Sequence, residues 1–198
     1  MGHYRNFTVD FPQRLSELDH QFRPLALDAG LEVTYTLMKL AAAFLLPYER
    51  LDGDSGARDA DVDPARRLSI RRDLELDRRF GDSSYCGGSK EWQLLEVKDF
   101  SGGPRRWQEA GSVVDSRVRE VLQIIRHSVA HSNVFFDGES KIEHVYLGNR
   151  RPGAGRETYC VIRCKVHELE RLIDCWIRNV QKLRVNPALI WNELEVAA

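Results

Sequence analysis

The sequence predicts a mainly α-helical fold with an inserted β-hairpin and long loops. Apolar residues recur at helical spacing near the amino terminus, after residue 112 and near the carboxyl terminus. Residues 141–165 instead resemble two strands around a loop rich in glycine and proline, which predicts the hairpin. Residues 52–111 show neither pattern clearly. We therefore expect a loop-rich insertion there, within a single domain of residues 1–198.

The amino-terminal quarter of the chain predicts two helices. Residues 12–22 carry apolar side chains at helical spacing, and Pro24 is expected to interrupt that helix. A second pattern runs from about residue 25 to residue 46 and includes the strongly helix-prone "LAAAFLL". Pro47 is expected to end or kink it, because proline removes a backbone donor.

The middle of the chain gives weaker signals. The acidic, turn-rich residues 52–64 are expected to form a loop. Residues 65–80 predict a charged surface helix, in which arginines alternate with aspartates and glutamates as on a solvated, salt-bridged face. Residues 91–100 fit a short helix or a strand equally well.

From Ser112 onward the periodicity is clearer. Apolar residues at 114, 118, 121, 122, 125 and 129 mark one buried face of an amphipathic helix. The hairpin strands are expected near 141–147 and 157–165, around the loop 148–156. Residues 167–183 form another amphipathic pattern, followed by a tail that is expected to dock through Leu189, Ile190 and Trp191.

The composition limits the function classes. Hydrophobic residues make up 42% of the 198 residues, charged residues make up 30%, and the formal net charge is −1. Without a global positive field, any contact with nucleic acid must come from local patches. The most apolar stretch, "LMKLAAAFLL", falls short of the ~20 residues that a bilayer requires. Since the amino terminus also lacks a signal-peptide pattern, we expect a cytoplasmic protein without membrane contact.

The four cysteines, Cys86, Cys160, Cys164 and Cys175, form no C-x-x-C pair. The spacing of Cys160, Cys164 and His167 does not match a metal site, and no second pair of ligands accompanies them. We expect free thiols that pack as small apolar residues, with neither metal nor cofactor.

The stretch "IIRHSVAHSN", residues 124–133, places His127 and His131 one helical turn apart beside Arg126. At ~100° per residue, His127 lies about 180° and His131 about 220° from Val118, the centre of the apolar face. Neither histidine therefore belongs to the core. Their position leaves two alternatives open: solvated side chains, or a second packing surface such as another subunit, because apolar residues share this outer face.

The chemistry of these side chains favours phosphate as a substrate group. Histidine exchanges protons near neutral pH, and arginine holds phosphate through a rigid fork of donors. Together they are a minimal set for cleaving a phosphodiester without a metal. Arg126 and His131 are about 140° apart on the helix, so both reach one groove only if the helix ends near Ala130 or two subunits share the site.

The hexapeptide "RHSVAH" resembles the R-x4-6-H motif of the HEPN superfamily, the helical domains of many prokaryotic ribonuclease toxins. It follows a long amphipathic helix. His127 stands where the family often has asparagine, aspartate or histidine, and "AHSN" is similar to its frequent A-H-G/S-N ending. The apolar helix closing on "LLPYERL" is also similar to members of this group. The specific resemblance covers about residues 112–135, with looser agreement over 13–51 and 167–183 and none over 52–111.

The resemblance implies an antiparallel helical bundle that dimerises through its motif helices and cuts RNA at a composite groove, without metal, by attack of the ribose 2′-hydroxyl. His131 would be the principal acid or base. Arg126 would hold the scissile phosphate, and His127 would orient Arg126 or contact the phosphate. Further substrate contacts are expected from Ser128, Asn133, Arg150 and Arg151, although Ser128 and Asn133 are residue types that more often serve local backbone hydrogen bonds.

The expected partners are RNA and a second copy of the chain, and the resemblance adds an antitoxin or nucleotidyltransferase as a candidate. One alternative is a non-catalytic HEPN module, regulatory or part of a toxin–antitoxin pair, that binds RNA or nucleotide without cleaving it. Another is a nucleotide- or small-ligand-binding protein that uses the interface cleft. No phosphate-binding loop supports the latter, because "RPGAGR" lacks the lysine and the following serine or threonine of a P-loop.

Overall fold

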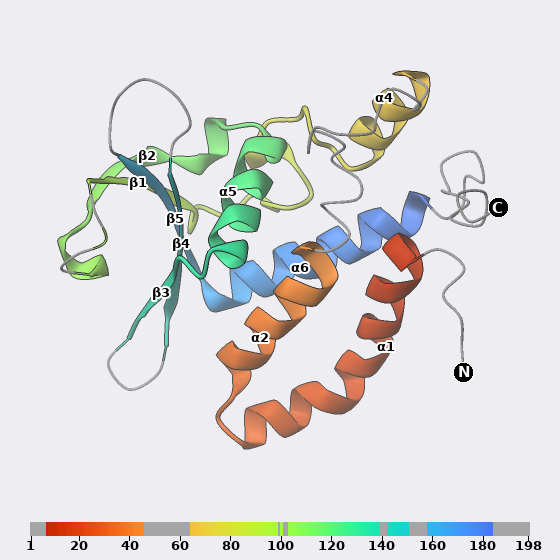
Figure 1. Ribbon diagram of the computed structural model, residues 1–198, viewed down its shortest axis with the longest axis horizontal. Helices are drawn as coiled ribbons and strands as arrows, with labels where there is room; N and C mark the ends of the chain where they lie inside the picture. The colour runs from red at the N-terminus through yellow and green to blue at the C-terminus, as the bar shows by residue number, and fades with distance from the viewer. Residues whose placement is uncertain are drawn as a thin grey trace. The chain divides into compact units, whose positions relative to one another are not determined.

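The structure is a computed structural model that describes residues 7–45, 64–98, 100, 103–138, 142–150 and 158–183. The chain separates into two compact units (Figure 1). Unit 1 comprises Met1–Leu76 and Ile173–Ala198, and unit 2 comprises Asp77–Leu172. Each unit has its own arrangement of elements and is described by itself.

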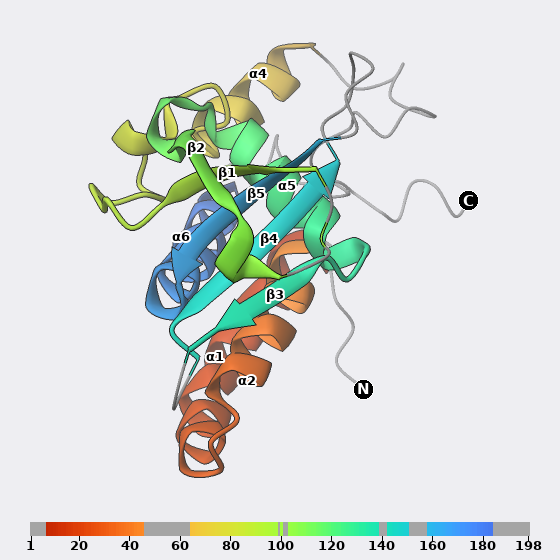
Figure 2. The ribbon, with the colours of Figure 1, turned by 90° about the vertical axis from the view of Figure 1, so that its left-hand side faces the viewer.

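The prediction of a helical bundle is wrong, because unit 2 is built on a five-stranded antiparallel sheet. Figure 2 shows the strands side by side, with a helix behind them. Their order across the sheet is β2-β1-β5-β4-β3. The strands are β1 Gln93–Val97, β2 Gln108–Ser112, β3 Val134–Asp137, β4 His144–Arg150 and β5 Tyr159–Lys165.

The predicted hairpin is confirmed, since β4 and β5 pair antiparallel from His144 with Lys165 to Arg150 with Tyr159. The other strands were not predicted. Strand β1 is stabilised by β2 on one side and by β5 on the other. Strand β5 lies more than sixty residues downstream of β1, so local periodicity in 91–100 could not distinguish a strand from a helix.

Helix α5, Val118–Ala130, packs against β4 and β5. Its predicted apolar face is confirmed: Val118, Val121, Leu122 and Ile125 are fully buried. The helix begins later than its periodicity suggested. Residues Val113–Asp115 form a 3-10 turn instead, in which the Ser112 side chain accepts a hydrogen bond from the backbone N–H of Val114.

The opposite face of the sheet carries a second core. Leu95, Val97, Tyr146 and Val161 are buried there, and the partly buried rings packed on them belong to Phe100, Trp107, Phe135 and Tyr159. The ring of Phe100 lies so close to the sheet that a side chain at Gly148 would come within 2.7 Å of it. Phe100 and Trp107, from the β1–β2 connection, thus cover this face. The unit also has 3-10 turns at Phe80–Asp82 and, within that connection, at Pro104–Arg106.

Unit 1 begins with two antiparallel helices, α1 Phe7–Asp28 and α2 Glu32–Leu40 (Figure 1). The predicted interruption at Pro24 is wrong, because α1 runs through it. The helix ends at Gly30, whose φ is +66°, with Leu31 N–H donating to Ala26 O at 2.7 Å and Gly30 N–H donating to Leu27 O at 3.0 Å. This paired closure is a Schellman motif, which glycine favours.

Three further helices lie in the described part of the chain: the π-helix η1 Ala41–Leu45, α4 Pro64–Asp73 and α6 Val166–Leu183. Helix α6 agrees with the prediction for 167–183 and crosses from unit 2 into unit 1. Helix α4 stops earlier than the predicted 65–80, since Glu75 adopts φ 55° and Leu76 N–H donates to Arg71 O at 2.8 Å. The predicted docking tail lies outside the described residues.

The core of unit 1 is organised around Trp176 and Lys39. The indole N–H of Trp176 donates to Ala43 O at 2.9 Å, and its ring meets that of Phe44 edge-on at 4.9 Å. Lys39 is only 6% exposed, and its Nζ lies 3.0 Å from Asp19 Oδ1 and 2.8 Å from Asp174 Oδ1. A buried ammonium thus joins α1, α2 and α6 through two carboxylates.

Candidate functional site

The carboxyl end of α5 carries the predicted site residues. The helix ends at Ala130, because Ser132 takes the left-handed φ of 56°. Asn133 N–H then donates to Ser128 O at 2.8 Å, and Ser132 N–H donates to Val129 O at 3.3 Å. This is again a Schellman closure. The helix therefore ends near Ala130, as the sequence predicted.

Arg126, His127 and His131 form a cluster at the carboxyl end of α5, outside its fully buried face. Arg126 Nη1 lies 3.1 Å from His127 Nε2 and 3.3 Å from Nδ1. The rings of His127 and His131 are stacked, with centroids 6.0 Å apart. Arg126 and His127 are half-buried and His131 is exposed, in agreement with the helical wheel. The arrangement places a permanent cation and two protonatable rings at one helix end.

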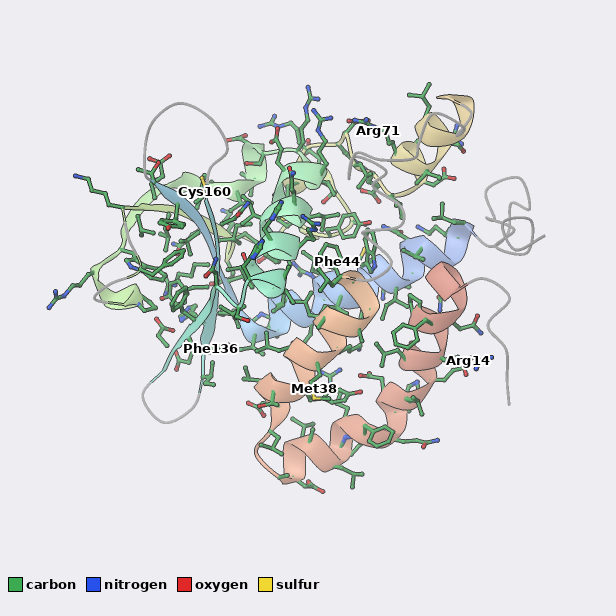
Figure 3. The ribbon with its side chains drawn as sticks, in the orientation of Figure 1. Arg14, Met38, Phe44, Arg71, Phe136 and Cys160 are labelled. Atoms are coloured by element: carbon green, nitrogen blue, oxygen red, sulfur yellow. The ribbon has the colours of Figure 1, made fainter. Side chains whose placement is uncertain are left out.

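A pocket of about 640 Å³ opens beside this cluster, within unit 2. His127 belongs to both, since it also forms part of the pocket wall. Figure 3 labels Cys160, another lining residue, near the start of β5. The full lining is Leu94, Glu96, Ala110, Ser116, Glu120, Gln123, Ile124, His127, Asn149 and Cys160.

Two rows of residues make this pocket, a helix row on α5 and a strand row across the sheet. Glu120, Ile124 and His127 lie on one face of α5, since residues three or four apart are neighbours on a helix. Glu96 pairs with Cys160, which pairs with Asn149, so these three lie side by side across β1, β5 and β4. The strand row could not be predicted from the sequence, because only the pairing of distant strands brings its members together.

The pocket contains acidic side chains, whereas the neighbouring histidine–arginine cluster is basic. Among the described residues, its lining includes Glu96 and Glu120 but neither lysine nor arginine. Glu120 Oε2 accepts a hydrogen bond from the backbone N–H of Arg117 at 2.9 Å, which fixes this carboxylate at the start of α5. Besides the His127 ring and the Cys160 thiol, the lining has a hydroxyl and two amides, those of Ser116, Gln123 and Asn149.

Of the other predicted contact residues, Ser128 and Asn133 make hydrogen bonds within the fold. Ser128 is fully buried, and its Oγ lies 2.6 Å from Ile124 O and 3.0 Å from Gly148 O, so it joins α5 to β4. Asn133 contributes through its backbone, donating to Ser128 O and accepting from Gly148 N–H at 3.0 Å. Arg150 is the last residue of β4, and its side chain lies outside the described part of the chain, as does Arg151.

A second polar cluster, which the sequence analysis missed, spans the opposite face of the sheet. Asp137 Oδ1 lies 2.9 Å from His144 Nδ1, and the Tyr146 hydroxyl donates to Asp137 Oδ2 at 2.5 Å. Arg163 Nη2 lies 3.1 Å from His144 Nε2, and Nη1 donates to Gln93 Oε1 at 2.7 Å. These groups link four of the five strands and hold the sheet in register.

Burial and pairing act together on the pKa values in this second cluster. Burial alone would raise the pKa of Asp137, but hydrogen bonds from Tyr146 and His144 and the nearby cations outweigh it, so this pKa lies below its usual range. Burial, reinforced by the bond to Asp137, raises the pKa of Tyr146 to about 12. The hydrogen bond between the two residues contributes to both shifts, because each partner stabilises the protonation state that keeps the bond.

The cysteines are free thiols. Cys86, Cys164 and Cys175 are buried and Cys160 is half-buried. Burial raises the pKa of the Cys86 thiol and that of Cys164. Among the residues that the structure describes, no group of three or more histidine, cysteine, aspartate or glutamate side chains is arranged to hold a metal ion. In the same part of the chain, no helix is both long enough and apolar enough to cross a bilayer.

Comparison with known proteins shows the family to which this chain belongs. The family model described as HEPN pEK499 p136 matches residues 1–183 of the chain. The match includes both compact units up to the end of α6, and with them the cluster at the end of α5. No curated protein and no solved structure matches the chain. Since the match extends over most of the sequence, the chain belongs to the HEPN family that this model describes.

Proposed function

We propose that this protein is a metal-independent endoribonuclease that acts as a homodimer, with Arg126, His127 and His131 at its reaction centre. The family gives a nuclease- or RNA-related role in general, since HEPN domains are commonly ribonucleases. The observation that carries the proposal is the cluster itself, in which Arg126 Nη1 lies 3.1 Å from His127 Nε2 and the His127 and His131 rings are stacked outside the core.

The proposed reaction begins at a ribose 2′-hydroxyl. His131 removes its proton as the 2′-oxygen attacks the adjacent phosphorus, and the partner subunit's His131 protonates the departing 5′-oxygen. The bond between phosphorus and the 2′-oxygen forms while the bond to the 5′-oxygen breaks. The products are one strand with a 2′,3′-cyclic phosphate and another with a free 5′-hydroxyl. One proton is taken up and one is given back, so the step needs no added reactant.

Arg126 supplies the electrostatic part of this mechanism. Negative charge increases on the non-bridging phosphate oxygens as the 2′-oxygen attacks, and a fixed guanidinium stabilises that charge. His127 is a positioning residue, since its ring nitrogen contacts Arg126 Nη1 and leaves fewer orientations to the guanidinium. His131 is the exposed member of the cluster and is therefore accessible to a polymer.

A non-cleaving binding module is the second candidate. It is favoured by the pocket beside the cluster, whose volume of about 640 Å³ lies within the range of about 300–1,000 Å³ that small-ligand sites occupy. In that case the same arginine and histidines bind the phosphate of RNA or of a nucleotide without cleaving it.

Cleavage of a mixed-sequence RNA by purified protein in excess EDTA decides between the two candidates. We expect products ending in 2′,3′-cyclic phosphate, and a loss of about 100-fold or more with His131→Ala. His20→Ala is the matched control, because His20 is exposed on α1. Size-exclusion chromatography with light scattering reports whether wild type and variants are dimers. Activity that EDTA abolishes, or that His131→Ala leaves intact, would falsify the nuclease proposal, and a monomeric active protein contradicts the composite site.

A further inference from the structure

The pocket beside the histidine–arginine cluster has a chemistry opposite to that of the cluster. Arg126 beside His127 suits a phosphate, whereas two carboxylates line the pocket and repel one. His127 belongs to both sites. A ligand that occupies both must therefore carry an anionic group joined to a neutral group rich in N–H donors.

We infer that this pocket is a nucleobase subsite that selects guanine next to the scissile phosphate. The inference deepens the proposed function and rests on it for the role of the cluster. A nucleotide places a neutral, flat, hydrogen-bonding ring one sugar away from a phosphate. Proteins that recognise unstacked bases bind them through their Watson–Crick edges and through contacts with their faces.

The carboxylates favour guanine over the other bases. The Watson–Crick edge of guanine presents N1–H and the N2 amino group side by side, and a carboxylate accepts two parallel N–H bonds. Adenine and cytosine present one amino group beside an acceptor nitrogen. Uracil presents one N–H between two carbonyl oxygens, which a carboxylate repels. Glu96 and Glu120 thus favour guanine because they attract its N–H donors and repel the acceptor groups of the other bases.

Glu120 is the carboxylate best prepared for this contact. The backbone N–H of Arg117 holds its Oε2 at 2.9 Å, so the side chain is oriented before a ligand arrives. Each carboxylate oxygen accepts two hydrogen bonds, which leaves capacity for both guanine donors. An amide N–H of Gln123 or Asn149 suits the guanine O6 acceptor, while Leu94 and Ile124 offer apolar surface for the ring.

The arrangement of the pocket also fits a flat ring. The strand row, Glu96, Cys160 and Asn149, crosses three neighbouring strands and spans about 10 Å at the usual strand spacing. The helix row ends at His127, the residue that contacts Arg126. A base between the two rows therefore has its sugar and phosphate near the cluster at the end of α5.

Binding of free nucleosides tests the inference without requiring cleavage. Isothermal titration calorimetry of the full chain compares guanosine with inosine, which lacks the N2 amino group, and with adenosine and uridine. We expect guanosine to bind at least tenfold more tightly than inosine. Glu120→Gln should weaken guanosine binding about tenfold or more, whereas Glu143→Gln, the same change at an exposed carboxylate in unit 2, should not.

A second variant keeps the test valid if Glu120→Gln perturbs the start of α5. Ile124→Trp fills the pocket from the helix side and leaves both carboxylates in place. We expect it to abolish guanosine binding while the thermal unfolding curve keeps its cooperative shape. Equal affinity for all four nucleosides, or guanosine binding unchanged by both Glu120→Gln and Ile124→Trp, overturns the inference.

Mapping of cleavage sites separates this inference from the proposed function. RNA cut mainly beside guanines, with that preference lost when inosine replaces guanosine, supports both. Guanosine binding without cleavage of any RNA refutes the nuclease proposal and leaves the guanine pocket standing. Cleavage without base preference, together with no guanosine binding, refutes the pocket and leaves the nuclease standing.

Discussion

The imidazole rings of His127 and His131 lie parallel, with 7° between their planes and 6.0 Å between their centroids. They are one helical turn apart on α5, and the helix ends between them at Ala130. Arg126 Nη1 lies 3.1 Å from Nε2 of the first of these rings, so the guanidinium forms part of the surroundings of His127. His127 is half-buried between the guanidinium and the pocket, while His131 is exposed. The two rings are therefore expected to contribute differently to activity.

Replacing His127 tests whether it acts through Arg126. His127→Asn keeps a hydrogen-bonding group at this position and should retain part of the RNA cleavage activity. His127→Phe keeps a flat ring but offers no acceptor to Arg126, so we expect kcat to fall at least tenfold below that of His127→Asn, with a smaller change in KM. Single-turnover cleavage assays measure the difference. Equal activity of the two variants argues that the ring of His127 serves packing alone.

The elements predicted correctly are those whose signal is local. The buried face of α5 and the whole of α6 follow from apolar residues repeated within a few turns, and the β4–β5 pair follows from two strands separated by a short loop. The motif at Arg126–His131 also lies within one helix end. For these segments a short window of sequence contains most of the contacts that decide the structure.

The elements missed are those that depend on distant partners. Strand β1 is fixed by pairing with β2 and β5, so "EWQLLEVKDF" carried no decisive pattern of its own. Pro24 was expected to end α1, but the left-handed backbone of Gly30 ends it instead. The pocket could not be predicted from the sequence either, because Glu96 and Asn149 come together only once β1, β5 and β4 are paired.

Lys39 is expected to be a stability residue of unit 1. Its Nζ is bound by Asp19 and Asp174 and only 6% of the side chain is exposed, so its removal leaves two carboxylates without their cation. Lys39→Met should lower the free energy of unfolding by about 2–3 kcal/mol, less than for a wholly buried pair because Asp174 is partly exposed. Urea denaturation measures this loss.

Two further variants control the Lys39 experiment. Lys182→Met removes an exposed ammonium from α6 and should have a smaller effect. Adding Asp174→Asn to Lys39→Met removes one of the stranded charges and should recover part of the lost stability. If the single variant unfolds at the urea concentration of the wild type, the buried ammonium contributes no net stability.

Asp137 is expected to make stability depend on acid pH. Its pKa is lower in the folded protein than in the unfolded chain, so the unfolded chain binds the proton more readily. The stabilisation is therefore present above the ordinary value of 3.8 and is lost as the pH falls through the lower folded value. Asp137→Asn should lower the free energy of unfolding by about 1–2 kcal/mol at pH 7, because its hydrogen bonds to Tyr146 and His144 are weakened. The variant's stability should also depend less on pH in the acid range. Thermal unfolding from pH 2 to pH 7 measures both effects, with the exposed Asp82→Asn as control.

Tyr35 and Tyr146 are expected to resist ionisation in alkali. Burial, followed by a hydrogen bond to Asp19 or to Asp137, raises the pKa of each from 10.0 to about 12. A raised pKa means that their contribution to stability is complete below pH 10 and is lost as the pH rises towards 12. Absorbance at about 295 nm, where ionised phenol absorbs, should show Tyr35 and Tyr146 ionising above the ordinary value of 10.0. Tyr35→Phe and Tyr146→Phe should each remove one late step, and a protein that stays folded by circular dichroism yet titrates in one step near pH 10 contradicts the assignment.

Ser128 lies within the motif but is expected to act on the fold. Its hydroxyl is fully buried and lies within hydrogen-bond distance of Ile124 O and Gly148 O, so it ties α5 to the strand that carries Asn149. Ser128→Ala should cost about 1 kcal/mol of unfolding free energy, the usual contribution of one buried hydrogen bond, and Ser128→Cys should cost more because the larger sulfur must fit between helix and sheet. Urea denaturation measures both. A variant with wild-type stability that cleaves no RNA assigns Ser128 to the substrate instead, and would mean that the β4–α5 contact opens when RNA binds.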